Sequence, residues 1–274
     1  MTKAHWTLDD LPWDSFDRAR VDPDQEKLAR AAAMVEFNSA DYVAYLENVF
    51  GGDEEFIEDA RRWGVEERQH GEALGRWAAL VDPSFDFDQR FARFREGFRP
   101  DTSATDSIRG SRAGEMVARC MVEVGTSSYY TALGDATDEP VLKAICRRIA
   151  SDELRHYKLF YDNLKRYLER DGLNKIQRLR VALGRINETE DDELSYAYYA
   201  ANTTPGQPYD REWANREYMR RAIPYYKDEH IDRALAMIFK ACGLKPRSRT
   251  FVAASYGAKW YLGRRQKQLA KIAA

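Results

Sequence analysis

The sequence is poor in the residues that build disulfides and small metal sites, with three cysteines and four histidines among 274 residues. The cysteines are far apart and form no Cys-x-x-Cys pair, which excludes a disulfide framework, a structural zinc site and a rubredoxin-type iron site. No run of about 18 apolar residues occurs, so no membrane span is predicted. The first twelve residues lack a secretion-signal pattern, and together with the unpaired cysteines this predicts a cytoplasmic protein.

The sequence also has no large excess of charge of either sign. Lysine and arginine total 43, aspartate and glutamate total 45, and the net charge of −2 favours no nucleic-acid partner. The balance is uneven, because residues 243–274 contain eight basic residues and no acidic one. This segment is interpreted either as a solvated terminal helix or as a docking surface for an acidic partner.

Strand-like alternation of polar and apolar residues is absent, and the periodicity predicts an all-α fold. Four long helices are expected, two of them with capping residues at Asp53 and Asp138, over residues 24–50, 53–81, 106–136 and 138–170. A short helix is expected within residues 82–105, and further helices over residues 174–201, 228–242 and 250–272. We therefore predict an N-terminal arm (1–24), a four-helix bundle (25–172) and a C-terminal helical extension packed on it (173–274).

The most informative pattern is a Glu-x-x-His motif that occurs twice, each time with a lone glutamate upstream. The first set is Glu36, Glu67 and His70, and the second set is Glu123, Glu153 and His156. The lone glutamate precedes the glutamate of the motif by 31 residues in the first set and by 30 in the second. Positions i and i+3 share a helix face, so each pair can reach one cation. Four carboxylates and two imidazoles in this order are what a di-metal site inside a four-helix bundle requires.

The surroundings of these glutamates predict that they point inward. Each interrupts a helical stripe of mainly small or apolar residues, although Arg119 lies near Glu123. Four ionised carboxylates in one core would be strongly destabilising, whereas two divalent cations neutralise them. The carboxylate-rich set favours iron, with manganese possible, over zinc. A single Glu-x-x-His is common as a solvated pair, but here two of only four histidines carry it. The other two, His5 and His230, are expected to be structural or surface residues.

At these motifs the sequence resembles the ferritin-like di-iron carboxylate superfamily. The segment Glu66-Glu67-Arg68-Gln69-His70-Gly71 and the segment Leu142–His156 resemble the second-helix and fourth-helix motifs of acyl carrier protein desaturases. Glu123 is followed after three residues by Thr126, as in those desaturases. The resemblance covers about residues 25–170 and implies a ferritin-like bundle with a di-metal core.

The resemblance also implies roles for individual residues. Its metal ligands are Glu36, Glu67, His70, Glu123, Glu153 and His156, and which glutamates bridge stays open. Asp152 would orient a ligand histidine, or it is a surface carboxylate. Thr126 would lie on the oxygen-binding side and deliver a proton, or its hydroxyl only bonds a preceding carbonyl.

The implied function is an O₂-dependent oxidase, a desaturase or hydroxylase, with two iron ions. Its substrate would be apolar and possibly carried on an acyl carrier protein. Electrons would come from an external ferredoxin or reductase, because no flavin or iron–sulfur motif is present, and the family leads us to expect a homodimer.

Other functions of this bundle stay open. A peroxidase or iron-handling protein of the rubrerythrin or bacterioferritin kind has similar ligands, and a tRNA-type hydroxylase weakly fits the basic tail. A ribonucleotide reductase subunit is disfavoured because Leu74 stands where its radical tyrosine is expected. An N-oxygenase is disfavoured because Ile149 replaces its additional histidine.

Overall fold

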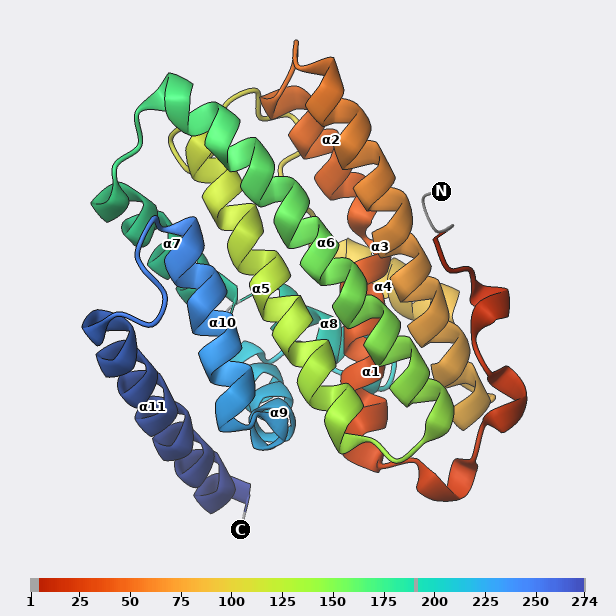
Figure 1. Cartoon of the computed structure of the whole chain (residues 1–274). Helices are drawn as coiled ribbons and strands as arrows, with labels where there is room; N and C mark the ends of the chain where they lie inside the picture. Colours follow the sequence, from red (N-terminus) through yellow and green to blue (C-terminus); the bar gives the residue numbers. More distant parts are fainter. Residues whose placement is uncertain (1–4, 190–191, 274) are drawn as a thin grey trace.

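The computed structural model describes residues 5–189 and 192–273 and confirms the all-α fold (Figure 1). Within these residues there is no strand. None of the described helices combines the length and the apolar character that crossing a bilayer requires. The bundle is built by α1 (Pro23–Phe37) with α2 (Ser39–Val49), α3 (Glu54–Val81), α5 (Arg112–Ala136) and α6 (Pro140–Asp171).

The remaining helices lie around this bundle. The connection between α3 and α5 contains α4 (Phe87–Gly97), as expected. The C-terminal part consists of α7 (Lys175–Thr189), α8 (Glu193–Asn202), α9 (Arg211–Ala222), α10 (Asp228–Ala241) and α11 (Arg249–Ala273). In Figure 1, α10 lies beside α5, and α11 forms the outer edge of the molecule beyond α10. The N-terminal arm contains three short 3-10 helices, Leu8–Asp10, Trp13–Ser15 and Arg18–Arg20.

Several predicted helix boundaries were wrong. The first long helix is interrupted at Asn38, whose N–H bonds to the Val35 carbonyl at 3.1 Å instead of continuing the α-helical pattern. This break allows the Ser39 hydroxyl to donate to the buried Gly64 carbonyl of α3 at 2.7 Å. The third helix begins at Arg112, six residues later than predicted, because Ser111 caps it through the Gly114 N–H.

Other corrections concern the fourth helix and the C-terminal part. Glu139, not Asp138, caps α6, since its side chain accepts from the Leu142 N–H at 2.7 Å. The helix expected over residues 174–201 is two helices, α7 and α8, separated by a segment that includes residues 190–191, which lie outside the described residues. The helix α9 was not predicted.

The bundle core consists of two hydrophobic clusters, with a polar layer between them. Along α3, Phe56, Ala60 and Trp63 belong to one cluster, and Ala73, Leu74, Trp77, Ala78 and Val81 belong to the other. The same order holds along α5, and it is reversed along α1–α2 and α6. Consequently α3 and α5 run in the same direction, and the connection that holds α4 must cross the bundle. One long crossover is the connection found in ferritin-like bundles.

Close packing of α1 against α3 depends on Gly71. A Cβ atom added at this residue would lie 2.6 Å from the Phe37 nitrogen and 2.8 Å from its Cα. Both are backbone atoms, so α1 would have to move. Gly71 therefore sets the distance between the two helices that carry the first half of the polar layer.

We predict that Gly71→Ala lowers the free energy of unfolding by about 1–3 kcal/mol through overpacking. Gly125→Ala is the control, because Gly125 lies exposed within α5 and an added Cβ would meet nothing within 4 Å. It should raise the free energy of unfolding by about 0.5–1 kcal/mol. Urea denaturation of metal-free protein measures both, and equal stability of Gly71→Ala and wild type would contradict the packing argument.

Candidate metal centre

The polar layer brings together all six residues of the two repeated motifs. Glu36 lies on α1, Glu67 and His70 on α3, Glu123 on α5, and the remaining pair, Glu153 and His156, on α6. All are buried, with exposed fractions of 7% or less. Their donor atoms form two groups in which every atom lies within 4.8 Å of the others. Each group could hold one metal ion.

The two groups have two carboxylates in common. Glu36 and His70 belong to the first group and Glu123 and His156 to the second, while Glu67 and Glu153 belong to both. Of the six motif residues, Glu67 and Glu153 are the two whose carboxylates reach both groups.

Several donor atoms in this layer have no hydrogen-bond partner among the described residues. These atoms are completely buried, and they are Nδ1 of both histidines, both carboxylate oxygens of Glu123 and Oε1 of Glu153. A buried polar atom without a partner costs about 1–3 kcal/mol, and more when it is charged. His70 Nδ1 lies 3.3 Å from Glu153 Oε1 and His156 Nδ1 lies 2.9 Å from Glu67 Oε1. Cations bound within the two groups would give all five atoms a partner. The donor set therefore fits a pair of divalent metals.

The carboxylates of the layer shift one another's pKa values. Burial and the neighbouring Glu67 carboxylate raise the pKa of Glu36 well above its ordinary value. Burial and the Glu153 carboxylate do the same to the pKa of Glu123. Burial alone would raise the pKa of Glu67, but the adjacent Glu36 carboxyl and His156 imidazole hold it well below the ordinary value.

The two histidines are shifted by the carboxylates around them. Burial would lower the pKa of His70, yet the Asp152 and Glu153 carboxylates outweigh it and raise that pKa well above the ordinary value. The pKa of His156 is likewise raised, against burial, by carboxylates that include Glu153 and Glu66. Four ionised carboxylates together with two divalent cations would carry no net charge.

Each histidine is oriented by a carboxylate on the opposite motif helix. Nε2 of His70 lies 3.0 Å from Asp152 Oδ2, and Nε2 of His156 lies 2.7 Å from Glu66 Oε2. Both Nδ1 atoms therefore face the shared glutamates. Arg155 donates to Asp152 at 2.6 Å and to Glu66 at 3.0 Å, which ties the two carboxylates together. Such partners fix the tautomer and orientation of ligand histidines.

Glu66 and Arg155 were not assigned a role from the sequence. A signal for Glu66 was available, because it precedes Glu67 as Asp152 precedes Glu153. The two motif helices are equivalent in this respect, so the partner proposed for one histidine implied a partner for the other.

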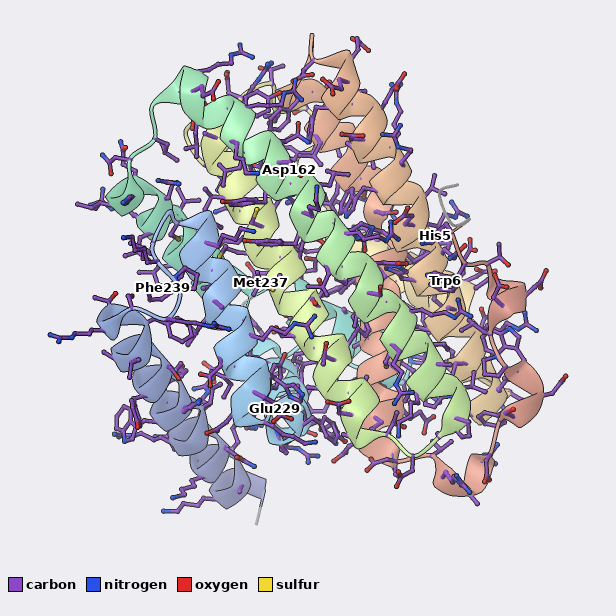
Figure 2. The ribbon with its side chains drawn as sticks, in the orientation of Figure 1. His5, Trp6, Asp162, Glu229, Met237 and Phe239 are labelled. Atoms are coloured by element: carbon purple, nitrogen blue, oxygen red, sulfur yellow. The ribbon has the colours of Figure 1, made fainter. Side chains whose placement is uncertain are left out.

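The N-terminal arm contacts Asp152 through His5 and Trp6, which Figure 2 labels beside α3. The Trp6 indole donates to Asp152 Oδ2 at 2.6 Å and its ring stacks on His70, with centroids 6.0 Å apart. His5 Nε2 lies 2.9 Å from the same carboxylate oxygen. His5 is thus part of the network around the centre, which the sequence did not indicate. Against burial, the contacts with His70, Arg155 and Trp6 hold the pKa of Asp152 well below its ordinary value.

Two hydroxyl groups also reach the carboxylates. Thr126 Oγ1 lies 2.7 Å from Glu153 Oε2, and it lies 3.2 Å from the Val122 carbonyl of its own helix. The bond to a preceding carbonyl considered from the sequence is therefore present, together with a hydrogen bond to a motif carboxylate. Tyr130, which is buried, donates to Glu36 Oε1 at 2.6 Å. A tyrosine of α5 thus contacts the centre. The position where a ribonucleotide reductase subunit is expected to have its radical tyrosine is occupied by Leu74, which lies in the hydrophobic core.

A cavity of about 50 Å³ reaches the centre from the side of Thr126. Its inner wall includes Glu36, Glu67, Glu123 and Glu153. Its outer wall includes Tyr42 and Arg119, whose guanidinium lies over the Tyr42 ring at 5.0 Å, together with Arg185 of α7 and Glu193 of α8. Helices after the bundle therefore contribute to the wall of this cavity.

The fourth histidine lies away from the centre. Nδ1 of the buried His230 accepts from the Lys227 backbone N–H at 3.1 Å, and its Nε2 lies 3.1 Å from Asp135. Both ring nitrogens have partners, so His230 has the structural role expected of it.

The sequence matches the model of one known protein family. The sequence model described as fatty acid desaturase matches residues 38–186, more than half of the chain. The match contains five of the six motif residues and begins two residues after Glu36. A search of the curated proteins found no match.

We predict that His70→Ala retains about one metal ion per chain and the wild type about two, because each histidine belongs to one group only. The measurement is plasma mass spectrometry after anaerobic loading with ferrous salt and desalting. His230→Ala is the matched control, since it removes a buried histidine outside the centre and should retain two. Full occupancy in His70→Ala would contradict the assignment.

Metal uptake should also depend on pH. The pKa values of Glu36, Glu123, His70 and His156 are all raised, so protons compete with cations for these side chains more strongly than for the free groups. Protons should therefore leave when divalent ions bind, and the affinity for metal should fall as the pH falls. Calorimetry in two buffers with different ionisation enthalpies measures this proton release, and uptake without any release would contradict the raised pKa values.

Proposed function

The chain belongs to the fatty acid desaturase family, and we propose that it is an O₂-dependent di-iron oxidoreductase that desaturates or hydroxylates an apolar acyl chain. The observation that carries the proposal is the set of unpartnered donor atoms in the buried layer, above all the two Nδ1 atoms that face the shared Glu67 and Glu153.

The proposed ligands are Glu36, Glu67, His70, Glu123, Glu153 and His156. Oxygen-rich ligation with two imidazoles suits iron, with manganese as the alternative. When bound, the metal pair would supply the activation of O₂ that removes hydrogen from an unactivated C–H bond. The protein would supply the ligand geometry, a water-poor layer between two apolar clusters, and control of protons.

Proton control is proposed for Thr126 and Asp152. Thr126 Oγ1 lies where the cavity meets Glu153, so it can pass a proton between the cavity and Glu153 Oε2. Asp152 acts through His70: it accepts from Nε2 and so keeps Nδ1 free for the metal. Asp152 is therefore a positioning residue, and Glu66 has the same role toward His156.

The remaining parts of the proposal concern partners. The three cysteines are buried and unpaired, and no cofactor motif is present, so two electrons per turnover would come from an external ferredoxin or reductase. The acyl chain would be free or attached to a carrier protein, and we expect a homodimer in the cytoplasm. The family match favours this reading over a rubrerythrin- or bacterioferritin-like protein and over a tRNA-type hydroxylase.

The test combines activity with metal content. Iron-loaded protein, reduced chemically and exposed to O₂ with free fatty acids and with acyl carrier protein thioesters, should give products that lack two hydrogens or gain one oxygen by mass spectrometry. Thr126→Val should lower the rate at least about tenfold, as expected for a group that moves a proton, and should keep both metals. Oxygen consumption without any modified acyl product would reject the proposal.

Thr131→Val is the matched control for Thr126→Val. Thr131 lies on the same helix, and its hydroxyl also donates to the carbonyl four residues earlier, at 2.7 Å from Ser127 O. Among the described residues, its hydroxyl also accepts from Arg233 at 3.3 Å and forms no hydrogen bond with a motif carboxylate. Equal loss of rate in both variants would show that Thr126 acts through the helix and not through Glu153.

A further inference from the structure

The outer face of α11 combines exposed aromatic side chains with cations. Tyr256 is 74% exposed and Trp260 is 64% exposed, and Val252 and Tyr261 are about half exposed. Arg264, Lys267 and Lys271 follow along the helix, are exposed, and have no ion-pair partner among the described residues. The Arg264 guanidinium lies over the Trp260 ring at 5.5 Å. Large exposed aromatic residues in line on one helix indicate a contact surface.

The opposite face of α11 is held by the rest of the protein. Lys259 forms ion pairs with Asp232 at 2.8 Å and Asp228 at 3.4 Å, both on α10. The Phe251 ring packs edge-on against Phe239 of α10, and Leu269 is buried. The helix is therefore fixed on the body, and in Figure 1 it forms an outer edge of the molecule. Its aromatic and cationic face is what remains for a partner.

A shallow groove of about 560 Å³ runs along this face. It is lined by Trp260, Gly263, Arg264 and Lys267, among other residues of α11. The missing side chain at Gly263 opens the groove between an aromatic ring and two cations. This combination suits a phosphate head group above an apolar chain.

Charge is distributed unevenly over the chain. Residues 243–274 hold eight basic and no acidic residues, whereas residues 1–242 hold 35 basic and 45 acidic residues. An anionic surface would therefore attract the α11 end and repel the remainder, which fixes the orientation of docking. A second copy of this face is a poor partner, because two surfaces with only positive charge repel each other.

We propose that α11 docks the protein on an anionic lipid bilayer, with Tyr256 and Trp260 at the level of the head groups and Arg264, Lys267 and Lys271 on lipid phosphates. Helices that lie in the membrane interface combine aromatic residues with lysine and arginine in this way. From Val252 to Lys271 the helix extends on the order of 30 Å. Its exposed side chains therefore form a straight row that can contact the flat surface of a bilayer along its whole length. The proposal goes beyond the proposed reaction and does not depend on it.

The test is flotation of the full-length protein with vesicles of phosphatidylglycerol and phosphatidylcholine at low and physiological salt. The wild type should bind the anionic vesicles, more weakly at higher salt, and should not bind pure phosphatidylcholine. Arg264→Glu with Lys267→Glu should weaken binding at least about tenfold. The control, Arg18→Glu with Arg147→Glu, makes the same change of net charge at exposed positions away from α11 and should stay within about twofold.

Insertion of Trp260 is tested separately by fluorescence. Vesicles with brominated acyl chains should quench part of the tryptophan emission of the wild type, and this part should be missing in Trp260→Phe, which preserves the helix and its charge. Absence of binding to anionic vesicles at low salt overturns the proposal. This holds even when α11 is found to bind an acidic carrier protein instead. Equal weakening by the α11 and control variants overturns it as well.

Discussion

The burial of four carboxylates from four helices in one polar layer is the constraint on which the rest of this structure depends. The layer separates two hydrophobic clusters, so the acids cannot reach bulk water without disrupting both. Two divalent cations would balance the charges of the four carboxylates. They would also give partners to both carboxylate oxygens of Glu123, which have no hydrogen-bond partner among the described residues.

Surrounding residues serve this constraint by orienting the donors. Asp152 and Glu66 each hold the far nitrogen of one histidine, and Arg155 binds both carboxylates. The N-terminal arm adds Trp6 and His5 to the Asp152 side, so residues at the start of the chain complete a network centred on α3 and α6. The cavity lies on the side of Thr126, where α7 and α8 contribute side chains to its wall. The bundle helices thus carry the metal-ligating candidates, and the elements added to the bundle enclose them.

The two faces of the C-terminal helix α11 differ in composition and in contacts. Residues of α11 that face α10 are paired or buried, while those facing outward are aromatic or cationic. Composition alone revealed the excess of basic residues, and it left open whether they belong to a solvated helix or to a docking surface. Only the placement of Trp260 and Tyr256 on the same exposed face as Arg264 and Lys267 favours docking.

The sequence by itself determined the all-α fold, most of the long helices and the six residues that share the buried polar layer, because helical periodicity and i, i+3 spacing are local properties. It did not reveal the break at Asn38, after which the Ser39 hydroxyl donates to the Gly64 carbonyl of α3. Nor did it reveal that Glu67 and Glu153 are the shared carboxylates, that Glu66 orients His156, or that His5 and Trp6 contact Asp152. These depend on distances between segments far apart in the chain, and such distances are set by packing.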